Sequence, residues 1–173
     1  MLWSFLLNNF VLIFVGGLGN LEELKIYRQN FQDSLATAYF TSHLPNLKVL
    51  QLSNCNLTNF NIPPASAIAN LETLILWFNP LLDIDGIPFE NFKKLRNLEL
   101  VIKTMSASAV KKFPNTLVEL MVYYSKENFS AVDFQHLNKL EKLTIWSDNG
   151  PCDCDLYNQL TYTLGEFILH LFY

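Results

Sequence analysis

The sequence has few cysteines and no excess of basic residues, and each shortage excludes a class of protein. Three cysteines in 173 residues are too few for a miniprotein held together by disulfides, and their odd number leaves at least one thiol unpaired within the chain. Twelve Lys and Arg residues against sixteen Asp and Glu residues give a net charge of -4. Binding to a phosphate backbone requires a basic surface, so we expect no nucleic-acid partner.

Hydrophobic residues, in contrast, make up half of the chain, and they recur at a fixed spacing. In residues 71–95 they form the pattern L-x-x-L-x-L-x-x-N-x-L, which is typical of leucine-rich repeats: a short strand followed by a returning segment. The residues at offsets 0, 3, 5, 8, 10, 13, 18 and 21 of this unit are Leu71, Leu74, Leu76, Asn79, Leu81, Ile84, Phe89 and Phe92. One such unit cannot bury its apolar residues alone, so the pattern predicts stacking.

The same pattern starts at residues 21, 47, 71, 95, 117 and 140, with spacings of 22 to 26 residues. We therefore predict an α/β fold over residues 20–147: a curved leucine-rich repeat solenoid of about six repeats with a parallel sheet on its concave face. In the second unit Cys55 occupies the position of Asn79. Either side chain can cap backbone groups of a buried turn there, so we expect Cys55 to be an inert, buried residue.

Residues suited to a catalytic or metal site do not occur at suitable spacings. His43 and His136 lie on the returning segments of different repeats, away from the strands, so they predict no catalytic triad. Cys152 and Cys154 lack the second pair of Cys or His residues that a four-coordinate structural zinc site needs. A glycine-rich phosphate loop is also absent. We predict no catalytic residue, no metal and no cofactor, and hence no enzyme.

The first nineteen residues allow two interpretations. Residues 1–15 are apolar and uncharged, and Gly17 and Gly19 supply the small residues at positions -3 and -1 of a cut after Gly19, as in a signal peptide. However, the segment has no Lys or Arg at its start and is interrupted by two asparagines, so it also fits the tail of an earlier repeat. Its uninterrupted apolar run is shorter than the roughly 20 residues of a membrane-spanning helix, so we expect no span.

A different pattern follows the last repeat. Residues 148–173 begin with the sequence D-N-G-P-C-D-C-D-L, which contains Cys152 and Cys154, and continue with an apolar helix-like run. The open hydrophobic end of a solenoid must be covered, so we predict a C-terminal cap here. The six units together with this segment resemble the extracellular leucine-rich repeat proteins, including Toll-like receptor ectodomains, whose caps begin N-P-x-x-C-x-C-x-L. Those caps use two further cysteines that residues 155–173 lack, so we expect a partial cap.

The resemblance implies a secreted or cell-surface protein, a receptor ectodomain or a fragment of one, that recognises a protein ligand or co-receptor. Two tripeptides agree with this location, because Asn56-Leu57-Thr58 and Asn128-Phe129-Ser130 are N-x-S/T acceptors for glycosylation. Both are predicted to follow a strand, where the turn could face solvent. Two such tripeptides are also near the number expected by chance in a chain of this length.

The residues that the repeat pattern leaves free predict where a ligand would bind. Side chains alternate along a strand, so if offsets 0, 3 and 5 enter the core, offsets 2, 4 and 6 face the open concave sheet. Large apolar and aromatic residues recur there and at the adjacent offset 7, and such patches usually mark interaction sites. The predicted binding residues are Tyr27, Ile75, Trp77, Phe78, Glu99, Met121, Tyr123, Tyr124 and Trp146.

The sequence thus favours a non-catalytic protein–protein interaction module with a binding strip centred on Trp77, Tyr123 and Trp146. Three alternatives stay open. These side chains could pack against one another or, in a fragment, against a neighbouring segment; the same strip could bind a lipid or another apolar ligand; or the chain could be a purely structural stacking segment.

Overall fold

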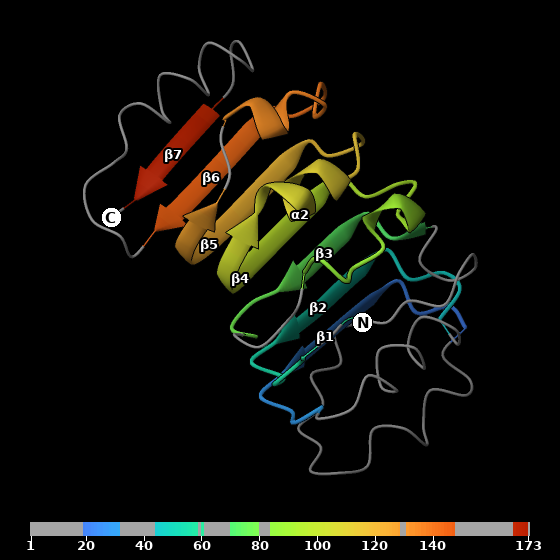
Figure 1. The fold of residues 1–173 in the computed structure, drawn as a ribbon. Coiled ribbons are helices and arrows are strands. Elements are labelled where there is room, and N and C mark those ends of the chain that lie inside the picture. Colours follow the sequence, from blue (N-terminus) through green and yellow to red (C-terminus); the bar gives the residue numbers. More distant parts are fainter. Residues whose placement is uncertain are drawn as a thin grey trace.

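The computed structural model describes residues 19–31, 44–58, 60, 70–79, 84–128, 131–147 and 168–172. The strands in these segments are β1 (Glu23–Tyr27), β2 (Val49–Ser53), β3 (Thr73–Leu76), β4 (Asn97–Ser106), β5 (Glu119–Asn128), β6 (Lys142–Ser147) and β7 (Ile168–Phe172). They form one sheet in the order β1 to β7, and every neighbouring pair is parallel (Figure 1). The chain therefore returns to the same edge of the sheet after each strand, which makes it a parallel β-sheet solenoid.

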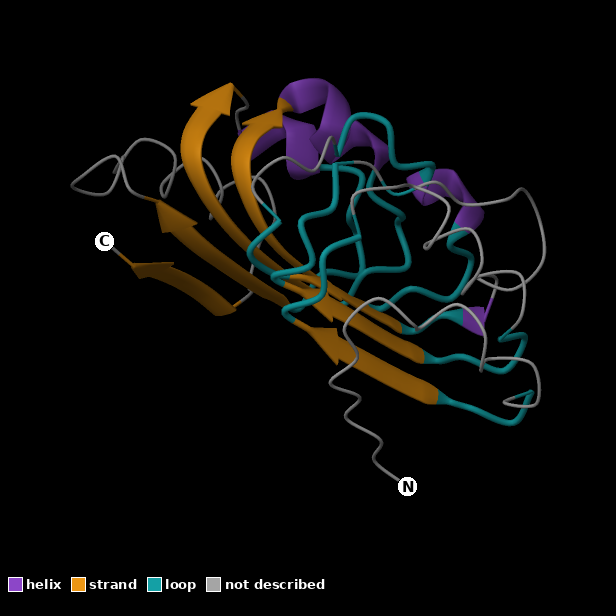
Figure 2. Ribbon diagram, turned by 90° about the horizontal axis from the view of Figure 1, so that it is seen from below, coloured by secondary structure: helices purple, strands orange, loops and turns teal. Residues whose placement is uncertain are grey.

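Helix is scarce in the described residues. It consists of α2 (Ala107–Lys112), two short 3-10 helices, η3 (Phe89–Asn91) and η4 (Ala131–Phe134), and the single 3-10 residue Asn70. Figure 2 shows these helices on one side of the sheet, together with most of the described connections between the strands. The prediction of a solenoid with a parallel sheet is confirmed, whereas the described chain contains less helix than the predicted α/β class implies.

Strands β1 to β6 each begin two residues after a predicted repeat start, and their register places equal offsets side by side. Leu50 pairs with Leu24 on one side and Leu74 on the other, and Leu74 pairs with Leu98. The side chains at offsets 3 and 5 of these strands are all buried. Each fully buried leucine contributes roughly 1.5 to 3 kcal/mol. The core therefore runs continuously along the helix-bearing side of the sheet.

Aromatic side chains from the returning segments fill the space that the strand leucines leave. Phe89, Phe92 and Phe113 are all at most 2% exposed. The ring of Phe89 lies edge-on to Phe113, with 5.0 Å between ring centroids, and 6.1 Å from Phe92. Edge-on aromatic pairs add about 0.5 to 1.5 kcal/mol beyond the area that they bury. These rings anchor the returning segments to the sheet.

Asn79 and Cys55 occupy the same corner in successive turns of the solenoid. Asn79 is fully buried; its Nδ2 donates to the backbone carbonyls of Leu52 (2.8 Å) and Trp77 (3.2 Å). The Cys55 thiol donates in the same way to the carbonyls of Ile26 (3.6 Å) and Ser53 (3.4 Å). Burial raises the pKa of this thiol. The prediction that Cys55 is a buried residue capping the turn is confirmed.

The turn at the end of the first three strands repeats with the same backbone conformation. Arg28, Asn54 and Phe78 stand at offset 7, and each has a φ of 55°. This left-handed conformation costs a non-glycine residue about 1 to 2 kcal/mol. Backbone bonds between turns offset the cost: Arg28 N donates to the carbonyl of Ser53 (3.0 Å), and Asn54 N donates to that of Trp77 (2.8 Å).

Strands β4 and β5 do not turn at this point. They continue to Ser106 and Asn128, and the two remain paired to their ends. Offset 8 in these units is occupied by Lys103 and Ser125. Without a buried asparagine to satisfy the backbone groups of a turn, pairing with the neighbouring strand satisfies them instead. The carboxyl ends of the two strands bend toward the helix-bearing side (Figure 2), and Ser106 caps α2 by accepting a hydrogen bond from Ala109 N (3.0 Å).

The structure corrects one prediction at the C-terminal end. Within residues 148–173, the segment Ile168–Phe172 forms strand β7, which pairs in parallel with β6, and is not part of a helical run. Strand and helix are hard to distinguish in a short apolar stretch, since periodicity does not decide between them. Residues 1–18 and 148–167, which contain the predicted signal peptide, Cys152 and Cys154, lie outside the described residues.

Candidate functional site

Seven of the nine predicted binding residues lie on the sheet face opposite the helices, which we call the outer face and define as the residues at offsets 2, 4 and 6 of each strand. The strand register aligns them into rows. The offset-4 row runs Lys25, Gln51, Ile75, Glu99, Met121, Thr144. In the offset-6 row, Val101 pairs with Tyr123, and Tyr123 pairs with Trp146.

Trp77 extends the offset-6 row by one position. It follows directly on Leu76, the last residue of β3, which pairs with Leu100 of β4. By the same register Trp77 lies beside Val101. We call Trp77, Val101, Tyr123 and Trp146 the aromatic strip. All four side chains are half-buried.

The β1–β2 end of the outer face is polar and makes its own hydrogen bonds. Tyr27 Oη donates to Gln51 Oε1 (2.9 Å), and Gln51 Nε2 donates to Ser53 Oγ (3.0 Å). Gln51 and Ser53 are only 6% and 3% exposed. The expectation that every outer-face position is open is therefore wrong at these two residues, and also at Thr144 of the offset-4 row, which is 4% exposed. The polar groups of Gln51 and Ser53 are already satisfied, so this end of the face offers a ligand little beyond the exposed ring of Tyr27.

Glu99 lies at the centre of the outer face, with Ile75 and Met121 on either side of it in the register. Its carboxylate is half-buried, and this burial raises its pKa; the negative charge of Glu119 adds to the rise, while Lys142 opposes it. The nearby indole of Trp77 also lowers this pKa. Its Nε1 is buried and has no partner within hydrogen-bond geometry among the residues that the structure describes. A half-buried carboxylate between apolar neighbours is costly unless a ligand compensates it.

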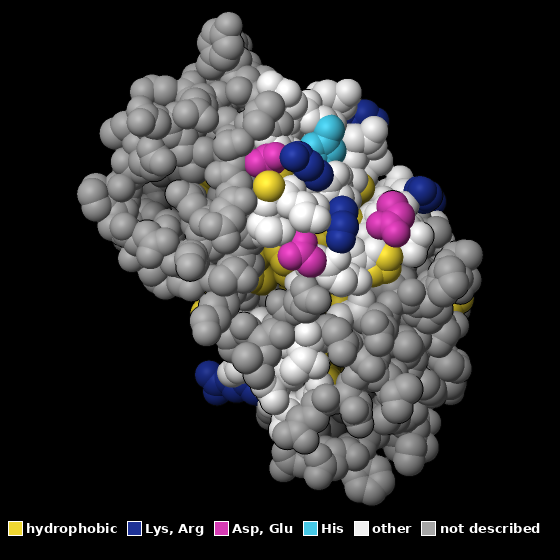
Figure 3. Space-filling model, viewed as in Figure 1, with side chains coloured by type: hydrophobic (Ala, Val, Ile, Leu, Met, Phe, Trp, Pro, Cys, Tyr) yellow, Lys and Arg dark blue, Asp and Glu magenta, His cyan; other side chains and the backbone are white. Residues whose placement is uncertain are grey.

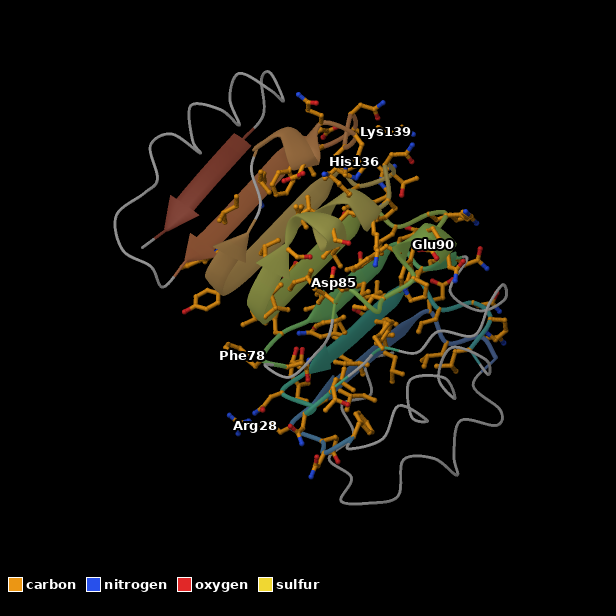
Figure 4. All side chains as sticks on the ribbon, viewed as in Figure 1. Arg28, Phe78, Asp85, Glu90, His136 and Lys139 are labelled. Atoms are coloured by element: carbon orange, nitrogen blue, oxygen red, sulfur yellow. The ribbon has the colours of Figure 1, made fainter. Side chains whose placement is uncertain are left out.

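Phe78 and Tyr124, predicted to stand beside the strip, lie in different settings. Phe78 occupies the left-handed turn after β3 and is 60% exposed, so it lies at the edge where the strands end rather than on the sheet face (Figure 4). Tyr124 belongs to β5 and pairs with Ile102, but its side chain lies outside the described part of the structure. Phe78 is thus the most exposed aromatic residue in the described chain, at one end of the aromatic strip.

The two predicted glycosylation sites also differ. Asn56 lies after β2, is exposed, and donates through Nδ2 to Oδ1 of Asn30 (3.0 Å). Asn128 does not follow a strand as predicted, because it is the last residue of β5. The longer β5, which lacks the turn of the earlier units, explains this difference.

The helix-bearing side of the molecule is charged, with positive and negative groups interspersed (Figure 3). Lys111 Nζ lies 3.1 Å from the carboxylate of the buried Asp133. His136 links two turns, because its ring nitrogens lie 3.1 Å from the carbonyl of Asp133 and 2.9 Å from that of Phe113. These contacts join α2 to η4 and are structural. His136 is thus a residue that joins neighbouring turns.

The sequence pattern missed one further feature, a groove at the edge where strands β4 to β6 begin. Basic residues line much of it, including Lys94 and Arg96 on either side of Leu95. The signal in the sequence is the run K-K-L-R around this repeat start.

Comparison with known proteins adds no identification. No family model matches the chain, and no curated protein matches it. Within the described ranges, no helix is both long and apolar enough to cross a membrane. In the same part of the chain, His, Cys, Asp and Glu side chains form no group of three that could hold a metal ion.

Proposed function

We propose that the chain is a leucine-rich repeat solenoid of about six repeats that binds a protein partner through its outer sheet face. The observation that carries this function is the aromatic strip, in which three half-buried aromatic side chains share one row with Val101, next to the half-buried Glu99. Tryptophan and tyrosine are the residues most enriched at binding hot spots, where they bury large areas with few rotatable bonds.

The repeat type is supported by two recurring local structures. The first is the corner occupied by Asn79 and Cys55, whose side chains donate to equivalent carbonyls in successive turns. The second is the left-handed turn at offset 7 of the first three units. Both recur at the spacing of the leucine pattern, as expected if each unit is built in the same way.

The proposed location is extracellular, either as a secreted protein or as part of a cell-surface ectodomain. The support comes from the resemblance of the repeats and of the Cys152-x-Cys154 segment to extracellular leucine-rich repeat proteins. The exposed Asn56 is compatible with a glycan at this position. Mass spectrometry of the protein secreted from a eukaryotic host tests this, because an unmodified Asn56 in a secreted product contradicts the glycosylation part of the proposal.

Photo-crosslinking tests the binding surface. A benzoyl-phenylalanine at Phe78 reports on contacts at the end of the aromatic strip, and the same probe at the exposed Glu90, on the helix-bearing side, is the control. The expected result is a covalent adduct with a protein from Phe78 and not from Glu90. Adducts of lipid rather than protein favour the apolar-ligand alternative, and equal labelling from both positions contradicts a specific outer-face site.

Two substitutions then measure the contribution of the strip. With the crosslinked partner purified, Trp77→Ala and Tyr123→Ala are each expected to raise the dissociation constant about thirtyfold, as for a hot-spot loss of ~2 kcal/mol. Circular dichroism establishes that each variant is folded. Unchanged affinity of both folded variants would refute the proposed site, and Glu90→Ala serves as the matched control for a surface change.

A further inference from the structure

The edge of the sheet where strands β4 to β6 begin carries an open groove with a volume of about 570 Å³. Lys139, at one side of it, lies at this edge, far from Phe78 at the edge where the strands end (Figure 4). The groove is thus separate from the exposed end of the aromatic strip. Its lining residues are Glu72, Lys93, Lys94, Arg96, Thr116, Val118, Lys139 and Glu141.

The groove concentrates positive charge that the protein itself does not neutralise. Its lining contains four cationic side chains and two carboxylates, although the whole chain has a net charge of -4. Among the described residues, no carboxylate lies within 4.0 Å of the charged groups of Lys93, Arg96 or Lys139. Other lysines near the same edge are paired: Lys48 Nζ lies 2.8 Å from Glu22.

The framework of the groove is held in place by bonds between neighbouring turns. The backbone N–H of Arg96 donates to the carbonyl of Glu72 (2.9 Å), and that of Val118 donates to the carbonyl of Arg96 (2.8 Å). Lys94 Nζ donates to Asn70 Oδ1 (2.8 Å), and Thr116 Oγ1 donates to the carbonyl of Leu95 (2.6 Å). A ligand therefore meets cations whose backbone is already ordered, which lowers the entropy lost on binding.

The spacing of the cations suits a single anionic side chain. Lys94 directly precedes the first leucine of the fourth repeat, and Lys139 directly precedes that of the sixth. One repeat lies between them, so their backbones are about 10 Å apart, which is twice the distance between neighbouring strands. The intervening turn contributes Thr116 and Val118, which are uncharged. A carboxylate above Thr116 would have Lys94 on one side and Lys139 on the other. Val118 has Arg96 on the side of Lys94 and Glu141 on the side of Lys139.

The order of charges along the edge distinguishes between kinds of anionic partner. Successive backbone bonds align Glu72, Arg96, Val118 and Glu141 in a row, so a carboxylate stands on each side of the cationic centre. A uniform polyanion, such as a sulfated glycan, would bring negative charge against both glutamates. An acidic residue with neutral or basic residues before and after it would not.

We propose that this groove binds an acidic segment of a protein partner, with an aspartate or glutamate side chain over Thr116 and Val118, among the cations Lys94, Arg96 and Lys139. The segment presents neutral or basic residues to Glu72 and Glu141. The site is additional to the proposed outer-face site, and its occupation does not depend on the aromatic strip.

An NMR titration of the ¹⁵N-labelled full chain with synthetic peptides tests the proposal. The probe is a ten-residue peptide with two central acidic residues and a lysine near each end, and its control has Asn and Gln in place of the acidic residues. The expected result is a saturable shift of the Thr116 and Val118 amide signals with the acidic peptide alone. The combined variant Arg96→Ala, Lys139→Ala is expected to weaken binding at least tenfold, and raising the salt concentration weakens it further.

Three outcomes would overturn the proposal: no shift with the acidic peptide, equal shifts with the amide control, or tighter binding of a sulfated heparin octasaccharide than of the peptide. The changed side chains are on the surface, so the variants are expected to stay folded; an unaltered spectrum away from the groove verifies this. Trp77→Ala is expected to leave peptide binding unchanged. Failure of the groove proposal is therefore distinguishable from failure of the outer-face proposal.

Discussion

Replacing Asn79 by alanine is the sharpest test of how the turns of this solenoid are joined. The Asn79 side chain bonds to four backbone groups: Oδ1 accepts from Cys55 N (3.0 Å) and Leu57 N (3.2 Å), and Nδ2 donates to the carbonyls of Leu52 (2.8 Å) and Trp77 (3.2 Å). Asn79, Leu52 and Cys55 are fully buried, and Leu57 is nearly so. Water does not reach these groups in the folded protein.

The expected loss follows from the groups left without a partner. The variant Asn79→Ala leaves the N–H groups of Cys55 and Leu57 and the carbonyl of Leu52 without this hydrogen-bond partner. Each unsatisfied buried group costs about 1 to 3 kcal/mol. Taking the low end for each, to allow for local relaxation, gives a loss of about 3 kcal/mol. This is a large fraction of the 5 to 15 kcal/mol that typically separates folded from unfolded states.

Urea unfolding, followed by circular dichroism, measures the change as a shift of the midpoint at constant slope. The variant Asn79→Cys is expected to lose less than Asn79→Ala, because Cys55 shows that a thiol can donate to the equivalent carbonyls. Asn138→Ala, at an exposed turn residue, is the control and is expected to change stability by less than about 0.5 kcal/mol. A loss for Asn79→Ala no larger than that of the control would refute the reasoning.

Two further substitutions test the environments of single residues. Because burial raises the pKa of Glu99 in the folded state, its charged form destabilises the fold at neutral pH. Glu99→Gln should therefore raise the free energy of unfolding, measured in urea at pH 7.5. This gain should shrink as the pH falls through the raised pKa and vanish below the ordinary glutamate pKa of about 4.3. A gain at pH 4 that equals or exceeds the gain at pH 7.5 contradicts this. The second substitution test concerns the buried Cys55 thiol, and it uses a variant in which Cys152 and Cys154 are replaced by serine. Because burial raises the pKa of this thiol and blocks access to it, the thiol should react with a disulfide reagent at least a hundredfold faster in urea than in the folded state. Equal rates would show that the thiol is accessible in the folded protein.

Much of the fold could be predicted because the repeat pattern is local. The spacing of Leu71, Leu74 and Leu76 alone places a short strand with one buried face, and a hydrophobic residue at the same offset of the next unit must stack beside it. The buried role of Cys55 follows in the same way, from its equivalence to Asn79. Positions in the outer-face rows, such as Trp77 and Glu99, could also be named, since side-chain alternation along a strand needs no knowledge of distant residues.

Features that depend on the neighbouring turn could not be predicted. Whether Gln51 is open or satisfied depends on Tyr27, which lies 24 residues earlier in the chain. The length of β5 depends on its pairing with β4 beyond the expected turn, and this moves Asn128 from a loop into a strand. A pattern within one unit carries no information about either, because these contacts arise only when two units are brought into register.

The sequence by itself determined a stack of parallel strands, a continuous leucine core and the identity of the residues facing outward. Only the tertiary structure decided which of those residues are exposed, how far Glu99 is buried, and that Arg96 and Lys139 lie along one groove. The physical reason is that burial and charge pairing depend on distances in space. Residues of adjacent turns lie about 5 Å apart across the sheet, although more than twenty residues separate them along the chain.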